Sequence, residues 1–360
     1  MAINGNKIQS HKGGEADETH YRYLLQLTNT QIRLPAIQAG CEMGLFRTLT
    51  ESEEPLSIES LSEQTGAAPT LLRRILRYLT SNGDVTETGK DCFEANYRTQ
   101  ALAAPAFQDS IYWMFNIGNP TYQRLPETLR KNGNTDSSKE LPFQRAFNTD
   151  MAFFGWSKQH PEYLRTFQSL MTVPHDGDWT NVISIPSLAM SVTAEQAVVV
   201  DIGGNVGHQS ARLRARYPDL PGRIIVQDLP ETIQNAEAIE GVEFMVHNFF
   251  EPQPIKGAKV YYIRNILHDW DDEKSTQILK SLVPAMDAHS LVVIDDMAVP
   301  DTGSHWWPAC LDIIMFSFFG ALERTESQWT DLVSGAGLKL IDIKSYNSTT
   351  VDSIIIASLP

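Results

Sequence analysis

The run from Val198 to His208 restricts the possible folds of this chain more than any other segment. A β-branched, apolar strand over residues 197–202 leads directly into a turn that contains Gly203, Gly204 and Gly207. Glycines let the backbone turn tightly and let a ligand approach the main chain without meeting a Cβ atom. Their spacing differs from the GxGxxG fingerprint of dinucleotide sites, so the turn does not require a bound pyrophosphate. We therefore expect a nucleoside to bind at the end of this strand.

The rest of the C-terminal half alternates between strand and helix patterns. This alternation predicts an α/β fold with a parallel, doubly wound sheet. Two final strands, 338–346 and 351–357, are close enough in sequence to pair as an antiparallel edge. The strands expected before them are at residues 223–227, 241–246, 259–263 and 290–294.

The N-terminal half is predicted to be helical. Apolar residues recur at helical spacing from residue 21 to 46, and Pro35 is expected to bend or break this run. A helix-turn-helix pattern over 55–79 and a hairpin at 83–93 then indicate a winged helix. Acidic residues outnumber basic ones in this region, so we expect it to contact protein rather than DNA. The aromatic-rich section that follows, 107–184, suits a pocket for a flat ligand.

Composition narrows the classes of partner. The formal net charge is -15, which repels phosphate backbones and anionic membranes, and we expect neither nucleic acid nor membrane as a partner. Three widely spaced cysteines without a CxxC pair argue against a disulfide framework and against a metal site. The first twenty residues lack the apolar core of a secretory signal. We therefore expect a cytoplasmic protein that holds no metal.

Three polar residues near predicted strand ends could carry chemistry. Asp228, at the end of the second strand, would accept hydrogen bonds from ribose hydroxyls, and Asp201 could face the cationic part of a zwitterionic cofactor. His268 is the candidate general base, because a neutral imidazole near physiological pH can remove a proton from a phenol or enol. Taken alone, a histidine at a strand end is more often structural.

The sequence resembles the caffeate-type S-adenosylmethionine-dependent O-methyltransferases of plants and fungi over nearly its whole length. The resemblance implies S-adenosylmethionine as cofactor, S-adenosylhomocysteine as product, a Rossmann-like catalytic sheet and a homodimer formed through the N-terminal domain. It rests on the winged-helix pattern and on the motifs at Asp201–Gly207, Asp228–Pro230, His268–Asp272 and Glu323–Glu326.

The resemblance also assigns roles residue by residue. Asn248 stands where the family usually has aspartate, Asp296 where glutamate is usual, and Asn205-Val206 where Gly-Thr is commoner. The implied cofactor-binding residues are Asp201, Gly203, Gly204, Gly207, Asp228, Leu229, Asn248, Phe249 and Arg264. The implied catalytic residues are His268, Asp269, Asp296 and Glu323, and the implied substrate-pocket residues are Phe147, Met151, Ile314, Met315 and Phe319.

The combined patterns divide the chain into four parts. We expect a disordered tail at 1–20, a winged-helix-like dimerisation domain at 21–120, a helical linker contributing to the substrate pocket at 121–185, and the cofactor-binding catalytic domain at 186–360.

The predicted function is O-methylation of a flat, apolar fungal secondary metabolite of the polyketide, phenol or pyridone type. The fungal branch of the family also includes leporin-type pericyclases, which bind the cofactor but catalyse dehydration and pericyclic rearrangement, and residues 141–151 resemble that branch. There an arginine-aspartate pair replaces His268-Asp269, so the histidine favours methyl transfer. A third hypothesis, a winged-helix regulator with a vestigial cofactor domain, is opposed by the acidic N-terminal half and the intact cofactor residues.

Overall fold

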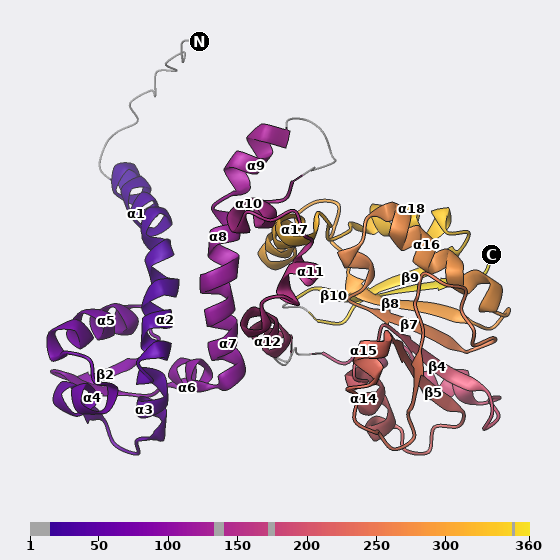
Figure 1. The fold of residues 1–360 in the computed structure, drawn as a ribbon, viewed down its shortest axis with the longest axis horizontal. Coiled ribbons are helices and arrows are strands. Elements are labelled where there is room, and N and C mark those ends of the chain that lie inside the picture. Colours follow the sequence, from indigo (N-terminus) through magenta and orange to yellow (C-terminus); the bar gives the residue numbers. More distant parts are fainter. Residues whose placement is uncertain (1–14, 133–139, 172–176, 348–349) are drawn as a thin grey trace, which may run out of the picture. The chain divides into compact units, whose positions relative to one another are not determined.

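The computed structural model describes residues 15–132, 140–171, 177–347 and 350–360, which form two compact units (Figure 1). The smaller unit is drawn from residues 1–120 and 157–173, and the larger unit from residues 121–156 and 174–360. The predicted four-part division of the chain stays a prediction.

The smaller unit contains the expected winged helix. Its three short strands pair antiparallel in the order β1-β3-β2, next to α4 and α5. The break predicted near Pro35 lies just before it, in a 3-10 turn at Thr30–Ile32. The elements are α1 (Glu15–Asn29), α2 (Arg33–Glu42), α3 (Leu45–Glu51), β1 (Leu56–Ser57), α4 (Ile58–Thr65), α5 (Pro69–Ser81), β2 (Thr86–Gly89), β3 (Cys92–Glu94), α6 (Tyr97–Ala103), α7 (Pro105–Trp113) and α12 (Pro161–Leu170).

Two surfaces of this unit bear on its partners. Arg73 of α5 donates to Asp91 at 3.0 Å and lies 3.6 Å from Glu59, so this basic side chain is already paired with acids. Helix α1 presents large apolar side chains to solvent, among them Tyr21 and Leu24, which are 62% and 52% exposed. Exposed apolar faces of this size are typical of protein interfaces.

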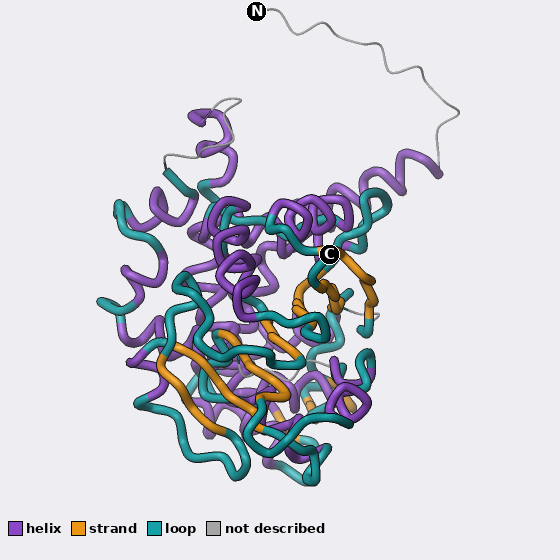
Figure 2. Tube along the Cα trace, turned by 90° about the vertical axis from the view of Figure 1, so that its right-hand side faces the viewer, coloured by secondary structure: helices purple, strands orange, loops and turns teal. Residues whose placement is uncertain are grey.

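The larger unit contains the predicted α/β sheet. Its strand order is β6-β5-β4-β7-β8-β10-β9, and the first five strands are parallel. The strand β10 inserts antiparallel between β8 and β9, so the two final strands pair as predicted. The strands are β4 (Ala197–Ile202), β5 (Arg223–Asp228), β6 (Glu243–Val246), β7 (Val260–Arg264), β8 (Leu291–Met297), β9 (Lys339–Ser345) and β10 (Asp352–Ser358). Figure 2 shows the strands lying next to one another.

Helices and turns complete the larger unit. Those that follow the parallel strands are α14 (His208–Arg216), α15 (Pro230–Ile233), the 3-10 turn η4 (Leu267–Asp269), α16 (Asp272–Leu282), the 3-10 turn η5 (Val283–Ala285), α17 (Trp306–Phe319) and α18 (Glu326–Gly335). The elements that precede the sheet are α8 (Asn119–Tyr122), α9 (Leu125–Asn132), α10 (Pro142–Phe147), α11 (Phe153–Ser157), the 3-10 turn η3 (Trp179–Asn181) and α13 (Ile185–Ala189). The π-helical turn η2 (Met114–Gly118) belongs to the smaller unit, and the division between the units falls within α8 and α11.

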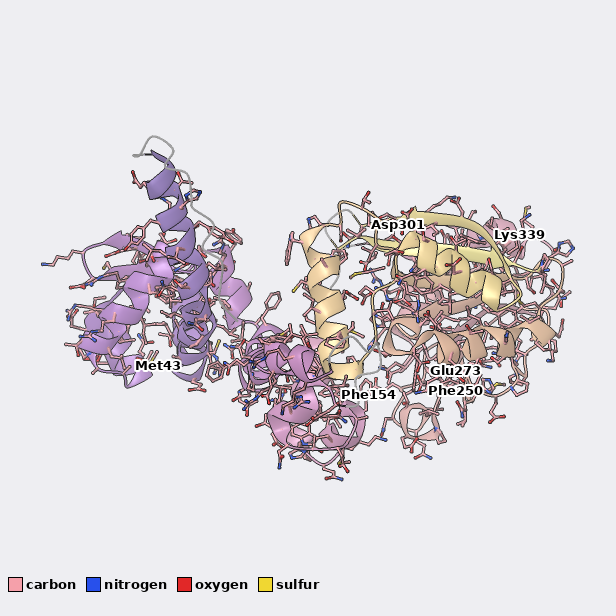
Figure 3. The ribbon with its side chains drawn as sticks, turned by 90° about the horizontal axis from the view of Figure 1, so that it is seen from above. Met43, Phe154, Phe250, Glu273, Asp301 and Lys339 are labelled. Atoms are coloured by element: carbon pink, nitrogen blue, oxygen red, sulfur yellow. The ribbon has the colours of Figure 1, made fainter. Side chains whose placement is uncertain are left out.

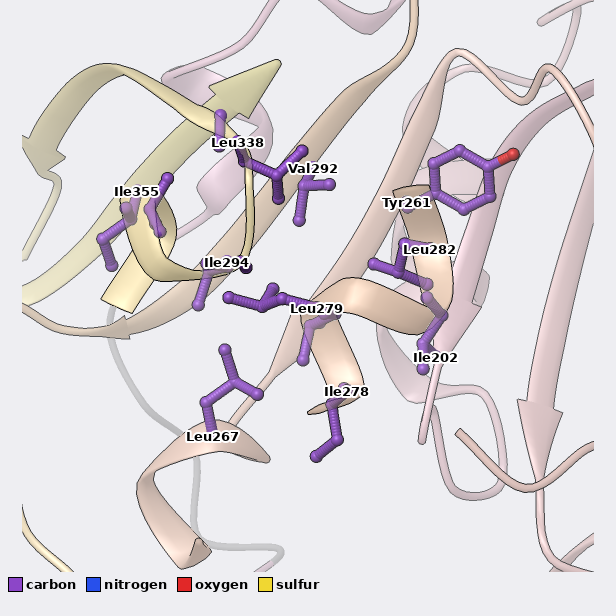
Figure 4. Packing of buried hydrophobic residues seen from close by; sticks show 14 of the residues in the cluster. Ile202, Tyr261, Leu267, Ile278, Leu279, Leu282, Val292, Ile294, Leu338 and Ile355 are labelled. Carbon is purple, nitrogen blue, oxygen red and sulfur yellow. The ribbon is translucent and has the colours of Figure 1, made fainter. Parts of the chain in front are cut away.

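The sheet is buried on both faces because successive side chains of each strand point to opposite sides. One face packs Ile202, Ile294 and Ile355 against Leu279 of α16 (Figure 4). Leu267 belongs to the same cluster and is fully buried, which fixes η4 to the core. The carboxyl ends of the parallel strands, where ligands bind in open α/β sheets, are therefore held on a rigid base.

The described ranges contain neither a membrane-spanning helix nor a metal-binding group of side chains. There, no helix has the length and apolar character needed to cross a membrane. The same ranges hold no group of histidine, cysteine, aspartate or glutamate residues arranged to bind a metal ion. Cys41, Cys92 and Cys310 are free thiols.

Candidate active site

The glycine turn after β4 is fixed by hydrogen bonds to the neighbouring strand. The amides of Gly203 and Gly204 both donate to the carbonyl of Gln227, at 2.8 and 3.2 Å. Gly203 and Gly207 have φ angles of 66° and 84°, which glycine adopts without the steric cost that a Cβ atom brings. Glycines thus stand at two of the three positions of this turn with left-handed backbone, and Asn205 stands at the third.

The turn also leaves no room for side chains. A Cβ atom on Gly203 would lie 2.7 Å from Ile266, and one on Gly204 would lie 2.6 Å from the carboxyl carbon of Asp201. Ile266 and Asp201 fill the space that side chains at these two positions would need, so the packing itself requires glycine. A nucleoside cofactor fits this turn through Asp228, whose carboxylate oxygens keep acceptor capacity.

Asp228 closes the turn on the β5 side. Its Oδ2 accepts from the amide of Asn205 at 2.9 Å, and its Oδ1 accepts from the amide of Leu229 at 2.7 Å. Asn205 itself has a φ of 54°, a conformation that asparagine tolerates better than most residues. Each carboxylate oxygen can still accept a second hydrogen bond, so Asp228 is positioned and available for ribose hydroxyls.

Asp201 is buried behind the glycine turn. Its carboxylate is only 2% exposed, accepts from the Ser210 hydroxyl at 2.7 Å and packs behind Gly204. Burial raises the pKa of Asp201 to about 6. The side chain supports the turn from behind, and its contact with the cofactor stays a prediction.

Arg264 belongs to a buried polar network. Its Nη1 donates to Asp295 at 2.5 Å and to the Tyr346 hydroxyl at 3.1 Å. The hydroxyls of Tyr262 and Tyr346 also donate to Asp295, at 2.5 and 2.7 Å. Sequence reasoning missed Tyr262, Asp295 and Tyr346. Alternation along β7 would have placed Tyr262 on the same face as Arg264, but nothing local points to Tyr346, which follows β9.

His268 lies in η4, directly after β7, among three carboxyl groups. Its Nδ1 is 2.9 Å from Oε1 of Glu323 and 3.8 Å from Oδ1 of Asp296, and its Nε2 is 3.8 Å from Oδ1 of Asp269. The structure therefore brings together all four predicted catalytic residues. With Glu323 on Nδ1, the Nε2 atom is the ring nitrogen left for a substrate.

The three carboxyl groups change the proton affinity of the imidazole. Burial alone would lower its pKa, but Asp296, Glu323 and Asp269 together raise the pKa of His268 to about 10. In the free protein His268 is thus mainly the imidazolium at neutral pH. This corrects the neutral imidazole expected from the sequence, which assumed the pKa of an isolated histidine.

Asp296 has no hydrogen-bond partner among the residues that the structure describes. Both of its carboxylate oxygens are buried and unpaired within the described residues, as is Oε2 of Glu323. Burial raises the pKa of Asp296 to about 7, against the lowering effect of His268. The predicted pair of flanking acids is therefore unequal, because only Glu323 hydrogen-bonds the imidazole.

Arg324, the residue after Glu323, holds the backbone around His268. It is fully buried, and its guanidinium donates to the carbonyls of Leu267 and Trp270 at 2.7 and 2.8 Å. The amide of Glu323 in turn donates to Asp312 of α17 at 2.9 Å. Two consecutive residues thus fix the ring and the main chain of the same histidine. The sequence motif signalled this pair, but Asp312 was missed.

The predicted substrate-pocket residues belong to an aromatic cluster. Phe147 of α10 lies with its ring centre 4.9 Å from that of Trp156, and Phe319 of α17 stacks on Phe154 at 5.3 Å. Figure 3 labels Phe154, which is 45% exposed, near one end of α17. Ile314 and Met315 lie on α17, which contacts η4, and Met151 follows α10. The cluster thus continues to the helix beside His268.

Comparison with known proteins identifies the relatives of this chain. Residues 122–339 match a model of the O-methyltransferase domain, and residues 25–107 match a model of the O-methyltransferase dimerisation domain. The chain is 38% identical over 340 residues to demethylsterigmatocystin 6-O-methyltransferase of Aspergillus parasiticus, which covers 94% of this chain and 88% of that protein.

Solved structures give the same picture. The complex of LepI with SAM matches with a TM-score of 0.89 at 35% identity, covering 94% of this chain and 89% of LepI. A structure described as a pericyclic reaction enzyme matches with a TM-score of 0.88 at 34% identity, covering 96% of this chain and 92% of that one.

The fold and the site define a Rossmann-like methyltransferase with an N-terminal dimerisation domain. The chain belongs to the O-methyltransferase family whose two domain models it matches. The predictions of the family, of the fold class and of an S-adenosylmethionine-dependent O-methyltransferase are confirmed.

Proposed function

We propose that this protein methylates a hydroxyl group of a flat, apolar secondary metabolite, with His268 as the general base. The observation that carries the proposal is the 2.9 Å contact between His268 Nδ1 and Glu323, which directs Nε2 away from the acid. A ring held in this way can take the proton of a hydroxyl group at Nε2 as the oxygen is methylated.

The remaining residues position the reactants. S-adenosylmethionine, when bound, supplies an electrophilic methyl group on its sulfonium. The Gly203–Gly207 turn and Asp228 would hold the nucleoside part, and α17, which carries Ile314 and Phe319, would contribute to the site of the flat substrate. Because the electrophile is already activated, most of the rate acceleration comes from aligning the substrate oxygen with the methyl group.

Proton handling follows from the raised pKa of His268. The imidazolium must lose a proton before Nε2 can act as a base, so kcat/KM should rise with pH above neutrality. The positive charge of the cofactor disfavours the imidazolium and therefore assists this loss.

We also propose that the protein acts as a cytoplasmic homodimer. The match of residues 25–107 to a dimerisation domain and the exposed apolar side chains of α1 support association through the N-terminal unit. The three free cysteines are consistent with a reducing compartment.

A second candidate function is a pericyclic reaction with the cofactor bound but not consumed. The similarity to LepI and to a pericyclic reaction enzyme favours it, and so does an imidazolium that can stabilise negative charge in a polarised substrate. Fold and cofactor do not distinguish the two reactions, because function depends on the site.

One experiment separates the two functions. Incubation with methyl-labelled S-adenosylmethionine and candidate polyketide or pyridone substrates should give labelled product and an equal amount of S-adenosylhomocysteine. His268→Ala should lower turnover by about 10²–10⁴-fold, the usual contribution of a general base, without weakening S-adenosylhomocysteine binding.

The control is His289→Ala. This change removes an exposed histidine from the turn before β8, and turnover should stay unchanged. A product of unchanged mass, formed only with the cofactor present, would instead establish the pericyclic reaction. Undiminished methylation by His268→Ala would exclude His268 as the base.

A further inference from the structure

Asn248 lies where the base of the bound nucleoside is expected. It follows β6, the strand beside β5, and the amide of His247 donates to the carbonyl of Asp228 at 3.0 Å. A nucleoside whose ribose lies on Asp228 extends its base toward the end of the next strand. The ring of Phe249 lies 3.8 Å from the position that a Cβ atom on Gly203 would take, so the residue after Asn248 packs against the glycine turn.

The orientation of the Asn248 amide is fixed by the backbone. The Phe250 N–H requires an acceptor, and Asn248 Oδ1 accepts from it at 3.1 Å. The side chain is otherwise exposed, and its Nδ2 makes no hydrogen bond within the described residues. Asn248 therefore presents two N–H donors to the base, whereas an aspartate in the same conformation would present an acceptor oxygen.

A donor at this position suits some purine atoms and not others. The 6-amino group of adenine is itself a donor, so it forms no hydrogen bond with Nδ2–H. An unprotonated ring nitrogen or a 6-oxo group is an acceptor and does. Asn248 therefore cannot recognise adenine by accepting a hydrogen bond from its 6-amino group.

We propose that Asn248 donates to the purine base, so that the site does not require the 6-amino group and binds 6-oxopurine nucleosides about as well as adenine nucleosides. The proposal rests on the cofactor placement of the proposed function and adds the basis of its base recognition. One hydrogen bond at an exposed position changes affinity by about 2–10-fold, which sets the size of the effect.

The test is a binding measurement that involves no turnover. S-adenosylhomocysteine and S-inosylhomocysteine are titrated by calorimetry into the full-length protein and into Asn248→Asp. We expect the two dissociation constants of the wild type to agree within about 3-fold, and Asn248→Asp to favour the adenosyl ligand by about 10-fold. Asn235→Asp adds the same charge just after α15 and should keep the wild-type ratio.

A wild type that prefers the adenosyl ligand by tenfold or more would overturn the proposal, as would an Asn248→Asp variant with an unchanged ratio. In both cases tight binding of S-adenosylhomocysteine leaves the cofactor assignment intact. A wild type that binds neither ligand would overturn the cofactor placement and this proposal with it.

Discussion

Asp295 and Asp296 are adjacent on β8 and equally buried, yet their surroundings are opposite. Asp295 accepts hydrogen bonds from Arg264 and from the hydroxyls of Tyr262 and Tyr346. Asp296 accepts none within the described residues, and His268 Nδ1 lies 3.8 Å from it. Because neighbouring residues of a strand point to opposite faces, the two carboxylates belong to different environments.

The contrast distinguishes a carboxylate that stabilises the fold, Asp295, from one that lies beside the candidate base, Asp296. A buried polar network whose members are all paired is rigid, while an unpaired buried carboxylate costs free energy and persists where function requires it. We therefore expect the face with Asp295 to maintain the fold beneath the cofactor site. The face with Asp296 and His268 is expected to maintain the proton chemistry.

The largest effect is expected from Asp295→Asn. This change leaves the guanidinium of Arg264 buried without its counter-charge, which typically costs about 3–5 kcal/mol of unfolding free energy. The measurement is the midpoint of urea unfolding at neutral pH. The matched control is Asp296→Asn, the same chemical change one residue further along, and equal losses in the two variants would remove the distinction between the two sites.

A smaller effect is expected from Glu323→Gln. The variant keeps a hydrogen-bond acceptor for His268 but loses a carboxylate that raises the pKa of the imidazole. The rise of kcat/KM with pH should therefore move to lower pH, and the maximal rate should fall on the order of 10–100-fold because the ring is less firmly oriented. Glu326→Gln, an exposed change three residues later, should leave the profile in place. An unmoved profile in Glu323→Gln would contradict the role of that carboxylate.

The smallest effect is expected from Asp296→Asn and depends on pH. The pKa of Asp296 is about 7 in the folded protein and near its ordinary value of about 4 when unfolded. As pH rises from about 4 to about 7 the carboxyl ionises in the unfolded chain before it ionises in the folded protein, so stability is lost over this range and the loss levels off above pH 7. The asparagine variant lacks this loss. Relative to wild type it should gain about 1 kcal/mol between pH 6 and pH 8, measured by urea unfolding at both pH values. A gain that is the same at both pH values would show that Asp296 does not titrate there.

Much of the fold could be predicted from the sequence. The run at 197–207 combines a buried strand with glycines at the left-handed positions, and the alternating pattern after it fixes a parallel sheet. The insertion of β10 between β8 and β9 could not be predicted, because short-range pairing of two strands leaves their order in the sheet open. Neither the pattern nor the turn lengths specify that order.

The candidate site was predictable in its membership but not in its energetics. The resemblance to the family implied that Glu323 and Asp296 flank His268, and the structure brings both within 4 Å of the imidazole. The pKa of His268 depends on three carboxylates gathered from distant segments, and no local pattern reports their combined field. The single missing methylene of Asp296 relative to glutamate was visible in the sequence, but its unpaired oxygens became apparent only from the distances.

The corner formed by Glu323 and Arg324 has a consequence for how this architecture diversifies. Glu323 holds the imidazole ring of His268, and Arg324 holds the main chain beside it. The position of His268 is therefore set by the loop after α17 and not by the apolar side chains of α17. Helix α17 contributes Asp312 to that arrangement, and within the described residues no other side chain of α17 hydrogen-bonds His268, Glu323 or Arg324. We therefore expect substitutions elsewhere on α17 to change which substrate binds and to leave the position of His268 unchanged. In such an architecture the substrate can change while the general base stays the same.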